Sequence, residues 1–91
     1  MATYQIVIER RARKALARLP TQDHTRIVAA IDALAEDPWP PGCEPVRAAP
    51  RGTYRVRVGD WRVIYVVLDD EQVIIVARVT RRSERTYRGL K

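Results

Sequence analysis

Cysteine, lysine, histidine and long apolar runs are all scarce in this chain of 91 residues. The single cysteine, Cys43, has no partner for a disulfide within the chain, so nothing indicates an oxidising compartment. The longest apolar run, residues 63–68, is far shorter than the ~20 residues that cross a bilayer, and the first residues show no signal-peptide pattern. We therefore expect one small soluble domain over residues 1–91, located in the cytoplasm and without membrane contact.

Lysine is scarce among the basic residues, since all of them except Lys14 and Lys91 are arginines. The formal charge of +6 comes entirely from residues 46–91, because basic and acidic residues balance in residues 1–45. A guanidinium presents a planar donor fork that suits phosphate, but its pKa above ~12 makes it a poor proton acceptor. This pattern indicates an anionic partner, most commonly a nucleic acid, and a merely charged surface is the alternative.

The apolar pattern predicts two helices followed by strands. Residues 3–8 favour a strand, and the stripe Ala12, Ala15, Leu16 and Leu19 predicts an amphipathic helix that Pro20 ends. Thr21 is expected to cap a second helix, which stops before a loop over residues 39–45. Three strand-like runs follow: 53–58, 61–68 and 72–79. This order predicts an α+β domain, β-α-α-β-β-β, with a helical hairpin on one face of a mainly antiparallel sheet.

Two turns set the predicted register of the sheet. Gly59-Asp60 predicts a two-residue turn that places Arg57 opposite Arg62, and a three-residue turn at 69–71 would place Arg62 opposite Arg78. Because side chains alternate between faces along a strand, one face is then wholly apolar. Its expected members are Tyr54, Val56, Val58, Trp61, Val63, Tyr65, Val67, Val73, Ile75, Ala77 and Val79. We expect the helices to cover this face.

The opposite face is predicted to carry a cluster of arginines at one end. Its expected members are Arg55, Arg57, Arg62 and Arg78, with Arg81, Arg82 and Arg85 arriving from the end of the last strand. Like charges directly opposite one another destabilise a sheet, so the cluster favours a site where an anion is bound. Solvated arginines paired with nearby acids are the alternative. Apolar residues lie beyond the cluster on the same face: Ile64, Val66, Leu68, Ile74 and Val76.

Two segments carry a resemblance to a known family. GTYRVRVGDWRVIY (residues 52–65), followed by an acidic turn, an apolar strand and RRSERTYR (residues 81–88), closely resembles the RelE/ParE superfamily of bacterial toxins. The N-terminal strand and helical hairpin are similar as well, so the resemblance covers nearly the whole chain. It implies the RelE-like fold and, for the RelE branch, a ribosome-dependent endoribonuclease. Such an enzyme cleaves mRNA in the A site by attack of the substrate's own 2′-OH, with no metal or other cofactor.

The resemblance also implies roles for individual residues. Catalytic roles fall on the positions that match the motif: Arg57, Arg62, Arg82 and Tyr87. Phosphate-binding roles fall on the basic residues beside them: Arg55, Arg78, Arg81 and Arg85. Counted back from Tyr87, Arg81 takes the place of Arg82 as the arginine past the last strand. Tyr87 either stacks on a splayed base or packs against the chain end.

The chain departs from the RelE branch in one respect, because the two strand positions that often hold lysine are both arginine here. His24 is expected to be a surface residue, so the general base stays open between Arg57, Glu84 and a ribosomal group. Two other functions also stay open: ParE-like poisoning of DNA gyrase, and a binding module without activity.

A small acidic antitoxin is the implied partner, beside mRNA and the ribosome. The toxin would be monomeric or part of a toxin–antitoxin hetero-oligomer. We expect the antitoxin to contact the exposed apolar residues of the sheet, Ile64, Val66 and Ile74.

Overall fold

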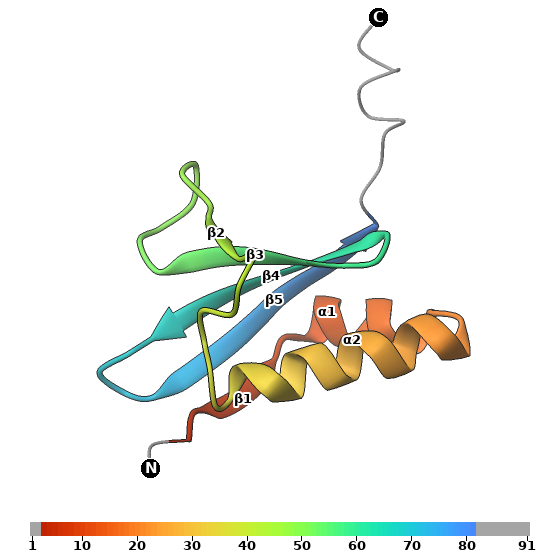
Figure 1. Cartoon of the computed structure of the whole chain (residues 1–91), viewed down its shortest axis with the longest axis horizontal. Coiled ribbons are helices and arrows are strands. Elements are labelled where there is room, and N and C mark those ends of the chain that lie inside the picture. Colours follow the sequence, from red (N-terminus) through yellow and green to blue (C-terminus); the bar gives the residue numbers. More distant parts are fainter. Residues whose placement is uncertain (1–2, 82–91) are drawn as a thin grey trace, which may run out of the picture.

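A five-stranded sheet and two helices form the two layers of the structure (Figure 1). The computed structural model describes residues 3–81. Its elements in chain order are β1 (Gln5–Ile8), α1 (Arg10–Ala17), α2 (Thr21–Leu34), β2 (Glu44–Pro45), β3 (Thr53–Val58), β4 (Trp61–Leu68) and β5 (Val73–Arg81). The strand order is β1-β5-β4-β3-β2, with β1 parallel to β5 and the other neighbours antiparallel. The predicted α+β fold, with both helices on one face, is confirmed.

The core lies between the helices and the sheet. Helix α1 buries Ala12 and Leu16, which are four residues apart and therefore share one side of the helix. Helix α2 buries Ile27, Ile31 and Leu34 in the same way. The sheet contributes Val63, Tyr65, Val67, Ile74, Val76 and Val79. Burial of each large apolar side chain contributes about 1.5–3 kcal/mol, so the apolar stripes hold the helical hairpin on the sheet.

The start of α2 differs from the prediction. Pro20, with extended backbone angles, is the residue that precedes the helix, and its carbonyl accepts a hydrogen bond from the His24 N–H at 2.9 Å. Thr21 is already the first helical residue, and no side chain caps the helix. The prediction that Thr21 caps α2 is therefore wrong, because the fixed φ of proline makes the turn into the helix one residue earlier.

The hairpin between β3 and β4 has the predicted register. Val58 faces Trp61 and Arg57 faces Arg62 across a two-residue turn. Gly59 adopts φ +62°, a left-handed conformation that glycine tolerates without steric cost. The short strand β2 was expected to be loop, and it extends the sheet beyond β3 by pairing Glu44 with Arg55.

The pairing of β4 with β5 differs from the prediction in two places. The turn between them is one residue longer than expected, because Gln72 adopts φ 55° within it, and Leu68 therefore faces Val73. A shift of one residue exchanges the two faces of a strand. The register then shifts again beside Ile64 and Tyr65, so that Ala77 is an extra residue in β5.

These two shifts exchange the faces only in the first half of β5. Ile74 and Val76, expected on the open face, are fully buried, and Ile75 takes a half-buried place on the outer face. The prediction that Ile74 is an exposed partner contact is therefore wrong. Beyond Ala77 the original face is restored, so Arg78 keeps its predicted face but lies opposite Ile64 instead of Arg62.

Candidate nucleic-acid interface

Three arginines form a row on the outer face of the sheet, which is the face away from the helices. Arg55 and Arg57 alternate along β3, and Arg62 of β4 is the direct cross-strand partner of Arg57. We call Arg55, Arg57 and Arg62 the arginine row. The row borders a hollow of about 300 Å³ whose other lining residues are Pro41, Gly42, Glu44 and Val56. The structure thus brings together three of the arginines that the sequence assigned to phosphate binding or catalysis.

Glu44 is the carboxylate of this hollow, and the sequence analysis did not identify it. Its Oε1 accepts hydrogen bonds from Arg55 Nε at 3.2 Å and from Arg55 Nη2 at 2.9 Å. These bonds lower the pKa of Glu44, and the charges of Arg55, Arg57 and Arg62 lower it further. Glu44 is therefore ionised at neutral pH, and its Oε2 has no hydrogen bond within residues 3–81.

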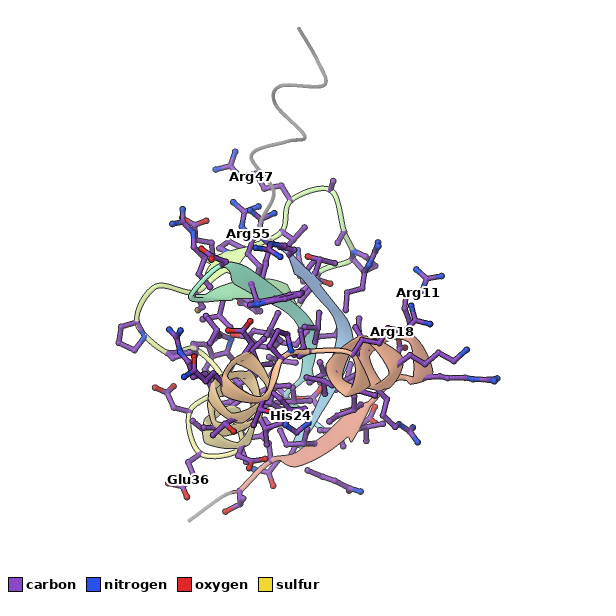
Figure 2. All side chains as sticks on the ribbon, turned by 90° about the vertical axis from the view of Figure 1, so that its right-hand side faces the viewer. Arg11, Arg18, His24, Glu36, Arg47 and Arg55 are labelled. Atoms are coloured by element: carbon purple, nitrogen blue, oxygen red, sulfur yellow. The ribbon has the colours of Figure 1, made fainter. Side chains whose placement is uncertain are left out.

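The Glu44–Arg55 pair also separates the first hollow from a second one. The second hollow has a volume of about 510 Å³ and is lined by residues 44–48 and Arg55. Figure 2 shows Arg47 and Arg55 at the same end of the molecule, away from the labelled residues of the helices. A chain of phosphates would therefore meet positive charge on both sides of the ion pair.

The segment that carries Glu44 is anchored to the core by Tyr65. The buried Tyr65 hydroxyl donates a hydrogen bond to the carbonyl of Pro38 at 2.7 Å. Burial is the main cause that raises the pKa of Tyr65, so the hydroxyl stays protonated and remains a donor. Trp39 is 43% exposed and makes edge contacts with Tyr4 and Tyr54, both at 6.4 Å between ring centroids. These aromatic contacts hold the proline-rich segment against the sheet.

The arginines of β5 are not part of the row. Arg78 is exposed on the outer face, opposite Ile64. Arg81 is the cross-strand partner of Trp61, whose side chain lies on the helix side of the sheet. The guanidinium carbon of Arg81 is 5.7 Å from the Trp61 ring centroid. The expectation that the strand end delivers Arg81 to the cluster is wrong, because the register places it on the opposite face. Arg82, Arg85, Tyr87 and Glu84 lie outside the described residues.

Other groups considered from the sequence take no part in this site. His24 is exposed on α2 and lies apart from Arg55 in Figure 2. Residues 3–81 contain no group of three or more His, Cys, Asp or Glu side chains that could hold a metal ion. No helix in the same range has the length and apolar character needed to cross a membrane.

The arrangement provides fixed positive charge and one carboxylate. Arginine donors held on a rigid sheet stabilise an oxyanion or a phosphate without reorganising, which is the strongest electrostatic contribution that a site of this kind offers. The arginines cannot accept a proton at neutral pH. Among the described residues that line the hollow, Glu44 is the side chain that could accept a proton at neutral pH.

Comparisons with known proteins identify the family of the chain. The profile of the family described as ParE toxin of type II toxin-antitoxin system, parDE, matches residues 6–86. The protein named RelE1 of Methanocaldococcus jannaschii is 32% identical in an alignment of 83 residues that covers 88% of this chain and 91% of that protein.

Solved structures show the same likeness. A chain of the archaeal RelE–RelB complex from Pyrococcus horikoshii is 31% identical, with a TM-score of 0.80 over 90% of this chain and 98% of that chain. A chain of the RelBE2 complex from Mycobacterium tuberculosis is 25% identical, with a TM-score of 0.73 over 89% of this chain and 100% of that chain. The isolated RelE toxin of E. coli, 21% identical with a TM-score of 0.75 over 96% and 95% of the two chains, shares the fold.

The two-layer fold and these relatives define a class, the small toxins of the RelE/ParE superfamily. The chain belongs to the ParE toxin family within this superfamily, since the family profile spans most of its length. It is a toxin of a toxin–antitoxin system.

Proposed function

We propose that this toxin is a ribosome-dependent endoribonuclease that cleaves mRNA in the A site. The observation that carries the proposal is the hollow of about 300 Å³ lined by Arg55, Arg57, Arg62 and Glu44. A scissile phosphate in this hollow would face fixed guanidinium donors, while the attacking 2′-OH belongs to the same nucleotide. The protein then has to align the reacting atoms and stabilise charge, which are the tasks that rigid donors perform well.

Glu44 supplies the proton acceptor that the arginines lack. The 2′-oxygen forms a bond to phosphorus, its proton moves to the Glu44 carboxylate, and the bond between phosphorus and the 5′-oxygen breaks. Because Arg55 occupies Oε1, the proton would go to Oε2. By the family resemblance, Arg82 would stabilise the negative charge on the leaving 5′-oxygen or donate a proton to it, and Tyr87 would stack on a base. Both residues lie outside the described residues.

The test is primer extension on mRNA after brief induction of the toxin. We expect cleavage at defined positions within codons, and its loss in Arg62→Ala and Arg57→Ala. Arg51→Ala is the matched control, because Arg51 is an exposed arginine outside the hollow. Unchanged cleavage by both row variants would refute the phosphate site. Glu44→Gln should lower the cleavage rate more than it lowers ribosome binding, since the amide keeps the shape but accepts no proton.

ParE-like inhibition of DNA gyrase is the second candidate, because the matching profile is that of the ParE family. Double-strand DNA breaks and an SOS response, with intact mRNA, would support it. The third function that the sequence left open, a binding module without activity, predicts neither mRNA cleavage nor DNA damage on induction. One induction experiment therefore separates the three.

An acidic antitoxin is the proposed protein partner. Val7, Val66 and Ile75 lie side by side across β1, β4 and β5 on the outer face, and Ile64 lies next to Val66 along β4. We call these four residues the outer apolar strip. Among the described residues, Val7 is 42% exposed and the other three are half-buried, so Ile64 and Val66 are less exposed than predicted. Relatives occur in RelE–RelB and RelBE complexes, and an apolar strip beside arginines suits an amphipathic acidic segment. Val66→Asp should abolish co-purification with the antitoxin, whereas Arg51→Ala should not.

A further inference from the structure

Helix α1 carries a second basic surface that is separate from the arginine row. Its exposed side chains are Arg10, Arg11, Arg13, Lys14 and, at the residue that ends the helix, Arg18. Ala12 and Leu16 face the core, so the basic side chains occupy the opposite arc of the helix. Figure 2 shows Arg11 and Arg18 projecting from one side of the molecule, well apart from Arg47 and Arg55.

The charges of this surface have one acidic neighbour, the exposed Glu9 that precedes the helix as its N-cap residue. The first turn of α1 contains no acidic residue, and within residues 3–81 no ion pair involves the helix. Arginines in a first turn lie at the positive end of the helix dipole, where cations are unfavourable. Arg13 offsets part of this unfavourable interaction, because its Nη2 donates a hydrogen bond to the carbonyl of Ile8 at 3.1 Å. The remaining cations repel one another unless an external anion neutralises them.

Apart from Glu9, the acidic residues of 1–45 belong to α2 and to the segment after it. Asp32 and Glu36 belong to the end of α2 and the turn after it. Figure 2 places Glu36 at the far side of the molecule from Arg11 and Arg18. The neutral sum over residues 1–45 therefore combines a mainly basic α1 with acidic residues that lie mostly on α2 and after it.

The chemistry of this surface favours a phosphate backbone over a protein. Protein interfaces are centred on buried apolar or aromatic side chains, and α1 exposes no large apolar residue. Four of the five cations are arginines, which bind phosphate through paired hydrogen bonds. Several cations on one helix face can contact successive phosphates of a nucleic-acid backbone, whereas a single carboxylate would neutralise only one of them.

We propose that α1 docks on the phosphate backbone of ribosomal RNA, so that the toxin is held by a surface distinct from its catalytic hollow. The proposal rests on the proposed ribosome-dependent function. In this arrangement, α1 binds ribosomal RNA independently of the RNA sequence, while the arginine row acts on the mRNA substrate. Removal of charge from α1 should therefore weaken the binding of ribosomes without changing where the mRNA is cut.

The experiment compares Arg11→Gln/Arg18→Gln with Arg26→Gln/Arg51→Gln, which removes the same charge from exposed positions outside α1. Binding to purified small ribosomal subunits and to a mixed-sequence RNA duplex is measured at salt concentrations from about 50 to about 300 mM. Two lost phosphate contacts should reduce the slope of log K against log salt by about 1.5 and the affinity by roughly tenfold or more. The control variant should keep the wild-type slope.

Equal slopes and affinities in the two double variants would overturn the proposal. So would an α1 variant that binds subunits normally but loses the antitoxin, because the surface would then be a protein interface. Failure of the proposed function has a different signature: the wild-type toxin would cleave no mRNA, while its salt-dependent binding to subunits would still be measurable. Thermal melts confirm that both variants are folded.

Discussion

Replacing Arg62 by glutamine should make the isolated toxin more stable and less active at the same time. Arg57 and Arg62 are direct cross-strand partners, and like charges in such a pair destabilise a sheet by about 0.2–1 kcal/mol. Within the described residues neither has an ion pair, because Glu44 is bound to Arg55. Glutamine removes the charge and keeps most of the side chain. We expect a gain of about 0.5 kcal/mol, or a rise in Tm of roughly 2–4 °C.

Urea unfolding of the wild type, Arg57→Gln, Arg62→Gln and the double variant measures this repulsion. At low salt each single variant should be more stable than the wild type. The double variant should gain little beyond one single variant, because one substitution already removes the repulsive pair. At 1 M salt the Debye length is about 3 Å, so the differences should disappear. Cleavage activity, measured on ribosomes at low salt, should fall in all three variants.

Two results would refute this reasoning. The first is a loss of stability in Arg62→Gln at low salt, which would mean that Arg62 makes a stabilising contact. The second is a gain of equal size at 1 M salt, which would mean that the effect is not electrostatic. Arg51→Gln serves as the control and should stay within about 0.5 kcal/mol of the wild type, as surface substitutions usually do.

Three further predictions concern the core and the ion pair. Ile74→Ala should cost about 2–5 kcal/mol in urea unfolding and the outer-face Ile75→Ala clearly less, and the reverse order would contradict the observed register. Tyr65→Phe leaves a buried carbonyl without its donor and should cost about 1–3 kcal/mol in a thermal melt; an unchanged Tm would contradict that contact. Arg55 lowers the pKa of Glu44, so the stabilising effect of the Glu44–Arg55 ion pair is fully present above the usual carboxyl pKa. This effect is lost as the pH falls through the lowered pKa of Glu44. An NMR titration should show the Glu44 pKa rising towards its usual range in Arg55→Gln, and no rise would exclude the pair in solution.

The sequence predicted what depends on short-range pattern. The spacing of apolar residues in α1 and α2 identified both helices, and Gly59 fixed the turn that pairs Arg57 with Arg62. A two-residue turn determines the register of a whole hairpin, so the arginine row could be located before the structure was known.

The sequence did not predict what depends on an irregularity. The extra turn residue Gln72 and the bulge at Ala77 each move β5 by one position, and neither has a periodic signal. The two shifts cancel for Arg78, so the prediction of its face was correct. They do not cancel for Ile74, so the prediction of its face was wrong. Both Ile74 and Ile75 are β-branched and apolar, so composition offers no means of distinguishing the buried one.

Glu44 escaped prediction for a related reason. It stands in a proline-rich segment that contains no helical or strand periodicity, and β2 is two residues long. Its place beside Arg55 follows from pairing with β3 and from the hydrogen bond between Tyr65 and Pro38, which are contacts between distant parts of the chain. A sequence pattern locates residues within an element, whereas this carboxylate is positioned by what its loop packs against.

In the proposed mechanism, the arginine content of this toxin divides the chemistry between two kinds of group. Arginines remain charged under all physiological conditions, so the row binds and stabilises anions but cannot take up a proton. Glu44 is held ionised by the same arginines, which keeps it available as an acceptor but makes it a weaker base. A lysine in the row would combine both tasks in one side chain. Because the row contains no lysine, loss of Glu44 should slow the chemical step, whereas loss of an arginine should weaken binding and slow the chemical step. Single-turnover kinetics can distinguish these two effects.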